Sequence, residues 1–284
     1  MLVRTDPSPF IDPAAVDVWD TWFRLRENGQ LRDVSVEATW ERVARELAKP
    51  ESALQTQLTA RLLDAQSNWQ IVLDERILAA AGTPQFAWPA DPIAVLNAAA
   101  FVGNALTDAA HFQFDAFRAT AELAEQILDN TLLLNASPNG AHRNLGIGII
   151  GVGDALALLG KRYDSAAGRV LASRIAKALA EGCFAANVRL ARDRGAMPEP
   201  APDAIDAAAV RGMPADLLDC ATRYGLRRAT STAITSQRRL ARFANNVADA
   251  LDPLDDHHDA ASKRPALSRV RTRSSCGYAF ALAR

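Results

Sequence analysis

Three arginines that stand close together are the residues of this chain with the clearest capacity for chemistry. Arg238, Arg239 and Arg242 place three permanent positive charges within one short stretch. Guanidinium groups bind phosphate and carboxylate oxygens through their charge and their paired N–H donors. The stretch could therefore hold an anion, although a solvated helix start that is rich in arginine has the same pattern.

The cysteines indicate neither a zinc site nor a disulfide framework. The chain has three of them, Cys183, Cys220 and Cys276, which are far apart and form no CxxC pair. This usage fits a reducing compartment. Cys183 falls within a predicted helix, on or near its apolar side, where we expect a buried and unreactive thiol.

A short acidic stretch contains residue types that bind metals. Asp255, Asp256, His257, His258 and Asp259 follow one another directly. Neighbouring positions in a loop lack the i, i+4 pair of histidines and the second ligand cluster that a zinc site would need. We therefore expect a solvated acidic turn, followed by a basic tail, and no metal site.

Four glycines interrupt an apolar run near the middle of the chain. Gly146, Gly148, Gly151 and Gly153 lack a Cβ atom, which lets backbones approach closely. The pattern favours tight burial against neighbours. A phosphate-binding GxGxxG loop is the alternative, but it requires a preceding strand, and the residues before this run predict a helix and a turn.

Composition predicts a globular protein with a substantial core. The 284 residues are 49% hydrophobic and 23% charged, with a net charge of −1, enough for one large domain or two small ones. Nothing in this charge balance favours nucleic acid or a membrane surface as a partner. The first residues lack the apolar core of a signal peptide, and no apolar run is long enough to span a membrane, so we expect a cytoplasmic protein.

Apolar residues recur at helical spacing over most of the chain. The predicted helices span residues 13–28, 36–49, 51–81, 112–135, 165–195 and 215–224, with a linker or short helix at 199–214 and a further helix from 239 to 251. Residues 84–92 are rich in breakers and form a candidate junction loop. The predicted fold class is mainly α, a multi-helix globular domain.

Several of these stretches resemble the large-subunit family of ribonucleotide reductases, and in particular its adenosylcobalamin-dependent branch. The resemblance lies in LDN at 128–130 and in RNLGIGIIGVGDALALLGKRYDS at 143–165, where spacing and glycine order agree. Further blocks are TWERVA at 39–44, RILAAAGT at 76–83, LNAAAFV at 96–102 and GLRRATSTAI at 225–234.

The resemblance implies a large-subunit fold from which most of the α/β barrel is missing. The chain passes from the family's barrel entrance at Thr83 to the segment just beyond its catalytic NPCGE motif at Leu96 in about a dozen residues. This implies an N-terminal helical segment at 1–83, a junction loop at 84–92, a reductase-like helical domain at 93–254, and the acidic turn and basic tail at 255–284.

The family's chemistry uses a cysteine thiyl radical, a glutamate base and an asparagine, and none of the three has a matching position here. We therefore expect no catalytic residue, and an enzymatic role stays open. A phosphate-binding loop of the family, APTGTIS, falls on residues 235–241, where its glycine is replaced by Arg238. The expected nucleotide- or phosphate-binding residues are Ser236, Arg238, Arg239 and Arg242.

Three functions follow as hypotheses. The first is a catalytically incompetent relative with a binding, regulatory or assembly role linked to deoxyribonucleotide synthesis, whose partner is a full-length ribonucleotide reductase. The second is a subunit of a split ribonucleoside-diphosphate reductase whose barrel is on a separate chain. The third is an anion- or nucleotide-binding module. From the residues we expect no cofactor, and adenosylcobalamin is implied only by the resemblance.

Overall fold

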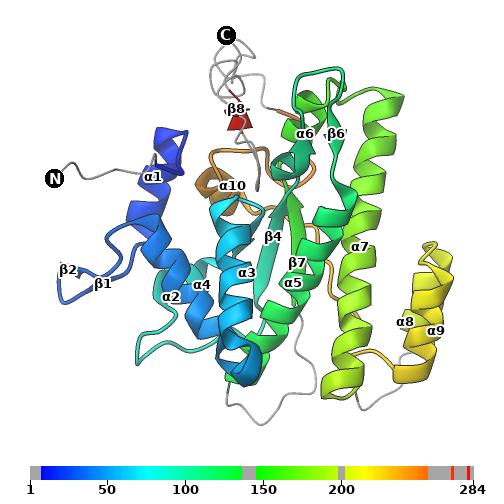
Figure 1. Cartoon of the computed structure of the whole chain (residues 1–284), viewed down its shortest axis with the longest axis horizontal. Coiled ribbons are helices and arrows are strands. Elements are labelled where there is room, and N and C mark those ends of the chain that lie inside the picture. Colours follow the sequence, from blue (N-terminus) through cyan, green and yellow to red (C-terminus); the bar gives the residue numbers. More distant parts are fainter. Residues whose placement is uncertain (1–7, 136–144, 198–201, 255–269, 272–279, 282–284) are drawn as a thin grey trace.

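Helices surround a short central sheet in the computed structural model of the chain (Figure 1). The structure describes residues 8–135, 145–197, 202–254, 270–271 and 280–281. These residues are mainly helical and form no closed barrel. The mainly α class predicted from the sequence is therefore confirmed. No helix among the described residues has the length and apolar character that crossing a membrane would require.

The N-terminal part consists of helices and one small hairpin. Its elements are α1 (Pro13–Val18), the π-helix η1 (Trp19–Phe23), β1 (Arg26–Glu27), β2 (Gln30–Leu31), α2 (Val36–Ala48), the 3₁₀ helix η2 (Lys49–Leu54), α3 (Gln55–Ser67) and α4 (Glu75–Ala80). The predicted helix at 13–28 ends earlier, at Phe23, because Asn28 and Gly29 adopt positive φ angles in the tip of the hairpin. Ser35 caps α2, with its hydroxyl accepting a bond from the Ala38 amide.

The predicted helix at 51–81 is wrong in its middle. After Ser67 the chain turns through Trp69, whose φ of 56° is left-handed, and then forms the strand β3 (Ile71–Leu73). Ile, Val and Leu are all buried in β3, so the residues read equally well as an apolar helix face. A short apolar run does not separate a buried strand from a buried helix by its spacing alone.

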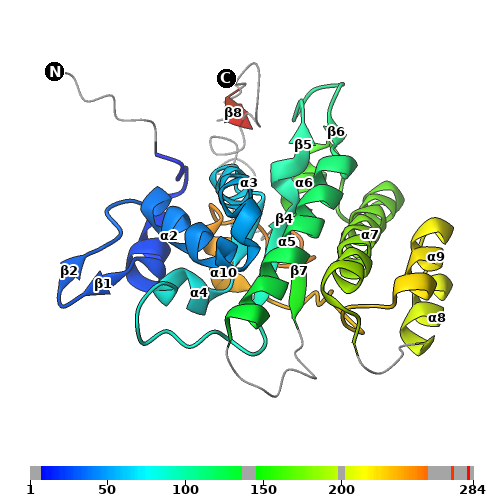
Figure 2. The same ribbon diagram turned by 60° about the horizontal axis from the view of Figure 1, so that its bottom comes forward.

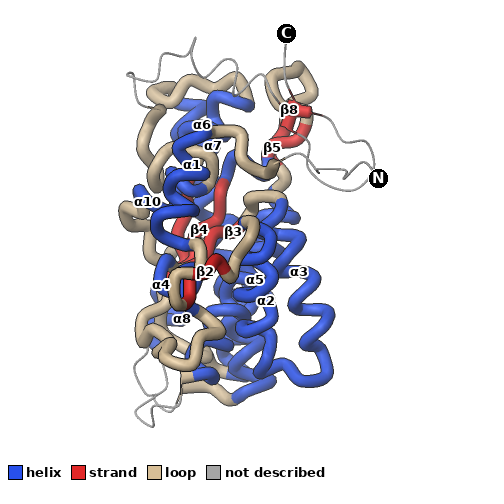
Figure 3. Tube along the Cα trace, turned by 90° about the vertical axis from the view of Figure 1, so that its left-hand side faces the viewer, coloured by secondary structure: helices blue, strands red, loops and turns tan. Residues whose placement is uncertain are grey.

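The central sheet contains β3, β4 (Ile93–Asn97) and β7 (Gly146–Ile150), in the order β3-β4-β7. β3 pairs antiparallel with β4, whereas β4 pairs parallel with β7. A parallel bridge between Ile147 and Thr232 adds a fourth chain segment beside β7. Helices cover both faces, with α2, α3 and α5 to one side of the strands and α10 to the other (Figure 3).

The glycine run proves to be β7 itself. The two-residue period of Gly146-Ile-Gly-Ile places Ile147 and Ile149 on one face and the glycines on the other. A Cβ at Gly148 would lie 3.0 Å from the Ala233 carbonyl oxygen, so the glycine lets the 231–235 segment approach. The predicted tight burial is confirmed, and the predicted helix before the run is α5, whereas the turn lies outside the described residues. The sequence did not predict that the glycine run itself forms a strand.

Two long helices connect the parallel segments. They are α5 (Phe114–Leu134), between β4 and β7, and α7 (Ala166–Arg194), between β7 and the segment that contains Thr232. The two helices pack closely because a Cβ at Gly182 would lie 2.5 Å from the Arg118 carbonyl oxygen. Smaller elements around them are η3 (Ala98–Phe101), β5 (Val102–Gly103), β6 (His111–Phe112) and α6 (Val152–Leu158).

The C-terminal part is built from short elements. They are α8 (Pro202–Val210), α9 (Ala215–Tyr224), α10 (Arg238–Phe243), β8 (Val270–Arg271) and β9 (Phe280–Ala281). Helices α8 and α9 lie outside α7 (Figure 2). The helix predicted at 239–251 is wrong beyond Phe243, because Asn245 and Asn246 have left-handed backbones and end α10.

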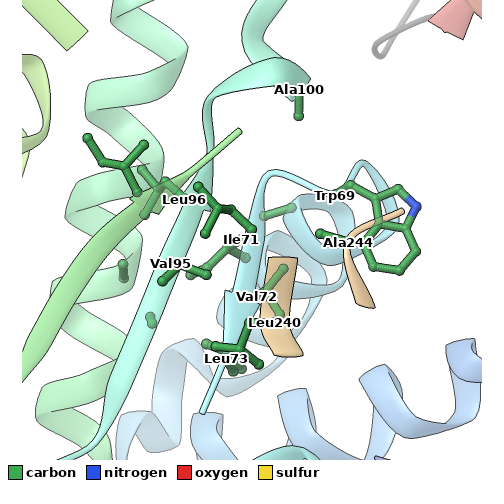
Figure 4. Packing of buried hydrophobic residues seen from close by; sticks show 14 of the residues in the cluster. Trp69, Ile71, Val72, Leu73, Val95, Leu96, Ala100, Leu240 and Ala244 are labelled. Carbon is green, nitrogen blue, oxygen red and sulfur yellow. The ribbon is translucent and has the colours of Figure 1, made fainter. Parts of the chain in front are cut away.

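One apolar cluster extends through most of the described chain. It contains residues from both sides of the 84–92 loop, including Trp40, Leu73, Leu96 and Phe243. Figure 4 shows the side chains of β3 between those of β4 and α10, with Val72 near Leu240. The strands are therefore fixed on both faces, which determines where their carboxyl ends lie.

Candidate functional site

The carboxyl ends of the parallel segments meet at one edge of the sheet. β4 ends at Asn97, β7 ends at Ile150, and the segment beside β7 continues from Thr232 to Ser236. In open sheets with parallel strands, ligands bind outside these ends, near the loops that follow them. The carboxyl ends of these segments are therefore the position at which this fold would place a ligand site.

A loop of the same chain, residues 244–254, covers these strand ends. The Gly151 amide donates to the Ala248 carbonyl at 2.7 Å, and the Ala248 amide donates to the Asp154 carboxylate at 2.6 Å. Gly151 has a φ of 71°, and a Cβ at Gly153 would lie 2.7 Å from the Asp252 carbonyl oxygen. The glycines at the end of β7 have no side chains, which lets loop 244–254 pack directly against them where a ligand could otherwise bind.

A surface hollow of about 610 Å³ lies between this loop, α1 and α10. Two of the predicted anion-binding residues, Arg238 and Arg242, line it together with the carboxylates of Asp12, Asp249 and Asp252. Arg242 is exposed and has no ion-pair partner among the residues that the structure places. The hollow therefore contains charges of both signs, and Arg242 is the cation in it that could bind an anion without first leaving a carboxylate.

The predicted site residue Ser236 is engaged within the protein. Its hydroxyl donates to an Asp249 carboxylate oxygen at 2.5 Å, and the Gln237 amide donates to the other oxygen at 2.7 Å. The Arg238 guanidinium lies 3.9 Å from the same carboxylate and is largely exposed. Asp249 therefore binds the hydroxyl and amide that the resemblance assigned to a phosphate.

Arg239 faces away from the hollow. It forms an ion pair with Glu75 and stacks over the Trp22 ring, with its guanidinium carbon 4.1 Å from the ring centre. Stacking on tryptophan and pairing with a carboxylate use both the face and the edge of a guanidinium. The structure thus brings Arg238 and Arg242 together and separates Arg239 from them.

No thiol lies at the strand ends within the described ranges. Cys183 is buried in α7, where burial, and then Glu125 and Glu122, raise the pKa of its thiol well above the ordinary value. Cys220 is exposed on α9. Cys276 and the acidic stretch at 255–259 lie outside the described residues. Among the residues that are described, no group of His, Cys, Asp and Glu side chains could hold a metal ion.

A buried ionic cluster, which the sequence did not predict, lies around Arg228, away from the carboxyl ends of the strands. Arg228 is only 7% exposed and pairs with Asp129 and Glu125 of α5, the second at 3.2 Å. The Ser231 hydroxyl donates to the same Glu125 oxygen at 2.9 Å. Asn187 of α7 accepts from the Arg227 amide at 2.7 Å. The cluster fastens the segment beside β7 to both long helices.

The two carboxyl groups of this cluster have opposite pKa changes. Burial raises the pKa of Glu125 to about 7, against the attraction of Arg228 and the Ser231 hydrogen bond. Burial also acts on Asp129, but the attraction of Arg228 and Arg227 and further hydrogen bonds outweigh it and lower its pKa. The sequence signal for the cluster was an acidic pair at i, i+4 beside the apolar stripe of a long helix, together with two adjacent arginines.

The comparisons with known proteins identify a family. No curated protein matches the chain. The family model described as "Ribonucleotide reductase, barrel domain" matches residues 92–235, which are half of the chain. The match begins at the start of β4 and includes β7 and Thr232, so it contains all three parallel segments. The chain therefore belongs to the ribonucleotide reductase large-subunit family.

Proposed function

We propose that this chain is a catalytically incompetent ribonucleotide reductase relative, a remnant with most of the barrel missing, which acts through binding or assembly in deoxyribonucleotide synthesis. The observation that carries the proposal is the state of the strand ends. Loop 244–254 of the chain itself occupies them, and the described thiols, Cys183 and Cys220, lie elsewhere.

The chemical reason concerns the radical step that the family performs. Hydrogen abstraction from a ribose requires a sulfur atom held at reacting distance in a pocket that excludes water. Cys183 is buried in the body of α7 with a raised thiol pKa, and Cys220 is exposed to solvent. Cys183 lines an open cleft between α7 and α8, away from the strand ends, so neither sulfur lies in a pocket that is closed to water.

A reductase assay on the pure chain tests this proposal. We expect no deoxynucleotide from ribonucleoside di- or triphosphates in the presence of adenosylcobalamin and a dithiol. The variant with Cys183→Ser, Cys220→Ser and Cys276→Ser should give the same result as the wild type. Cobalamin-dependent product from the wild type that disappears in the triple variant would overturn the proposal.

A second candidate function, a subunit of a split reductase, is favoured by the unpaired outer side of the 231–235 segment. The segment pairs with β7 on one side only among the described residues. A chain that carries the remaining strands could pair there. Reductase activity that arises only when such a chain is mixed with this protein would favour the split enzyme over the incompetent relative.

A nucleotide-binding module is the third candidate, and the exposed Arg242 in the 610 Å³ hollow is what favours it. Arg238 at the same hollow would add a second cation. The carboxylates of Asp249 and Asp252 oppose an anion there, so this candidate ranks below the assembly role.

A further inference from the structure

A second cleft, of about 500 Å³, lies away from the strand ends, between α7, α8 and the segment beside β7. Its walls are mostly apolar, and its polar groups come from the 229–232 stretch and from the side chains of Ser173, Lys177, Glu181 and Arg211. Clefts with apolar walls and few polar groups are typical binding sites. The lining residues that matter are Ala176, Ala180, Phe184, Ala208, Met213 and Thr232.

One wall of this cleft is an open sheet edge. The Ile147 amide donates to the Ser231 carbonyl at 2.8 Å, and the Ala233 amide donates to the Ile147 carbonyl at 3.0 Å. In a parallel ladder of this register the intervening residue, Thr232, directs its own N–H and C=O to the opposite side. Within the described residues these two groups have no hydrogen-bond partner.

The edge also lacks the features by which proteins protect an exposed strand. Residues 229–236 read ATSTAITS, with no charged side chain, no proline and several β-branched residues. Thr232, Ala233, Ile234 and Thr235 are all exposed. Unprotected edges of this kind pair readily with another extended chain.

Two cations lie at the cleft. Lys177 of α7 places its Nζ atom 3.7 Å from where a Cβ of Gly212 would be, next to Arg211 at the end of α8. Lys177 is only weakly neutralised, since its Nζ is 3.9 Å from the Glu181 carboxylate, and Arg211 has no ion-pair partner in the described part of the chain. The Glu181 carboxylate also lines the cleft, but it pairs with Arg118 at 3.3 Å, so the two cations give the cleft a positive charge.

We propose that this cleft binds an extended, acidic segment of a partner protein, which adds as a strand at Thr232 and places a carboxylate near Lys177 and Arg211. A small anion would use the two cations but would leave the Thr232 N–H and C=O unpaired, whereas a peptide backbone satisfies both. The inference deepens the proposed binding role, on which it rests, by naming the chemical class of the partner.

The test begins with a library of random nonapeptides displayed on phage and selected on the full-length protein. We expect the selected peptides to combine Asp or Glu with β-branched residues and to bind when synthesised. Binding should slow hydrogen exchange at the Thr232 amide, which a ligand elsewhere would leave unchanged. Failure to enrich any sequence, or enriched peptides that leave exchange at Thr232 unchanged, would overturn the proposal.

Two variants locate the edge contact. Thr232→Pro removes the outward N–H and leaves both bonds to Ile147 available, so peptide affinity should fall at least tenfold. Thr232→Val retains that N–H and serves as the matched control, with affinity close to the wild type. Equal peptide affinity for the proline variant, shown by circular dichroism to be folded, would contradict strand addition.

The charge contact has its own variant, Lys177→Glu with Arg211→Glu. The acidic peptides should bind it at least tenfold more weakly, and selection on it should enrich basic peptides. If AMP instead binds the wild type at this cleft, loses affinity in the double variant and binds Thr232→Pro normally, the site takes a small anion and the peptide proposal fails. The reductase assay is independent, so reductase activity would refute catalytic incompetence without removing a measured peptide contact.

Discussion

At the scale of single residues, Glu125 is the group whose ionisation should govern the pH dependence of stability. In the unfolded chain it ionises near its ordinary pKa of 4.5, whereas in the folded protein burial raises its pKa to about 7. The folded state therefore binds more protons between these values, and the free energy of unfolding falls as pH rises from about 4.5 to about 7.

Replacing Glu125→Gln should remove this dependence. A neutral amide has no charge to desolvate, so the variant should lack the loss between pH 5 and pH 7.5, which is on the order of 2–3 kcal/mol in the wild type. Chemical denaturation at a series of pH values measures it. Glu122→Gln, on the same helix but half-exposed and paired with Arg189, is the control and should keep the wild-type slope. An unchanged slope in the Glu125 variant would show that Glu125 is already ionised at neutral pH in the fold.

The arginines give a second residue-scale prediction. If the hollow binds phosphate, ADP at millimolar concentration should raise the melting temperature of the wild type, and the pair Arg238→Gln and Arg242→Gln should abolish this rise. Arg239→Gln is the matched control, because Arg239 pairs with Glu75 away from the hollow, and it should keep the rise. No stabilisation of the wild type by any nucleotide would remove the nucleotide-binding candidate.

These residues also show what a sequence can and cannot place. The charges at 238, 239 and 242 are evident from the letters, but the turn of α10 sends Arg239 to Trp22 and leaves Arg242 at the hollow. Asp249 could not have been predicted as the partner of Ser236, because the left-handed residues of loop 244–254, Asn245, Asn246 and Ala250, stand within a helical pattern.

At the scale of elements, the contact between α5 and α7 depends on Gly182. A Cβ there would lie 2.5 Å from the Arg118 carbonyl oxygen and 2.8 Å from the Ala121 Cβ, so Gly182→Ala must push the helices apart. Overpacking of this kind costs about 1–3 kcal/mol, more than the gain in helix propensity of about 1 kcal/mol. Val170→Ala, at an exposed position of α7, should be nearly neutral. Urea denaturation compares the two variants, and a stabilised Gly182→Ala protein would contradict the close approach.

The long helices were predicted well because their caps and periods agree. Ser165 caps α7 and Gly195 ends it, and both signals stand in the sequence. The strands were not predicted, because β3 and β4 are short, apolar and buried on both faces, so they show no alternation. In β7 the alternation exists, but it is between isoleucine and glycine, and glycine is depleted in strands, so the run predicted tight burial but not a strand.

At the scale of the whole molecule, the segments on either side of the 84–92 loop form one core. β3 pairs with β4 across this loop, and the apolar cluster includes Trp69 and Leu73 on one side and Leu96 and Phe243 on the other. The sequence blocks predicted a helical segment at 1–83 and a separate domain at 93–254. Because the two parts share one core, we expect that neither part folds without the other.

Residues 1–83 and 93–284, expressed separately, should each fail to give a cooperative thermal transition, because each exposes the apolar surface that the other buries. Co-expressed, the two should copurify as a folded complex that recovers the helical circular dichroism of the intact chain. The control is an intact chain whose 84–92 loop is doubled in length with glycine and serine, which should cost only about 0.6 kcal/mol in loop-closure entropy. A cooperative transition in isolated 93–284 would show that the reductase-like part folds on its own, and β3 would then be an addition to a complete domain rather than a strand of its core.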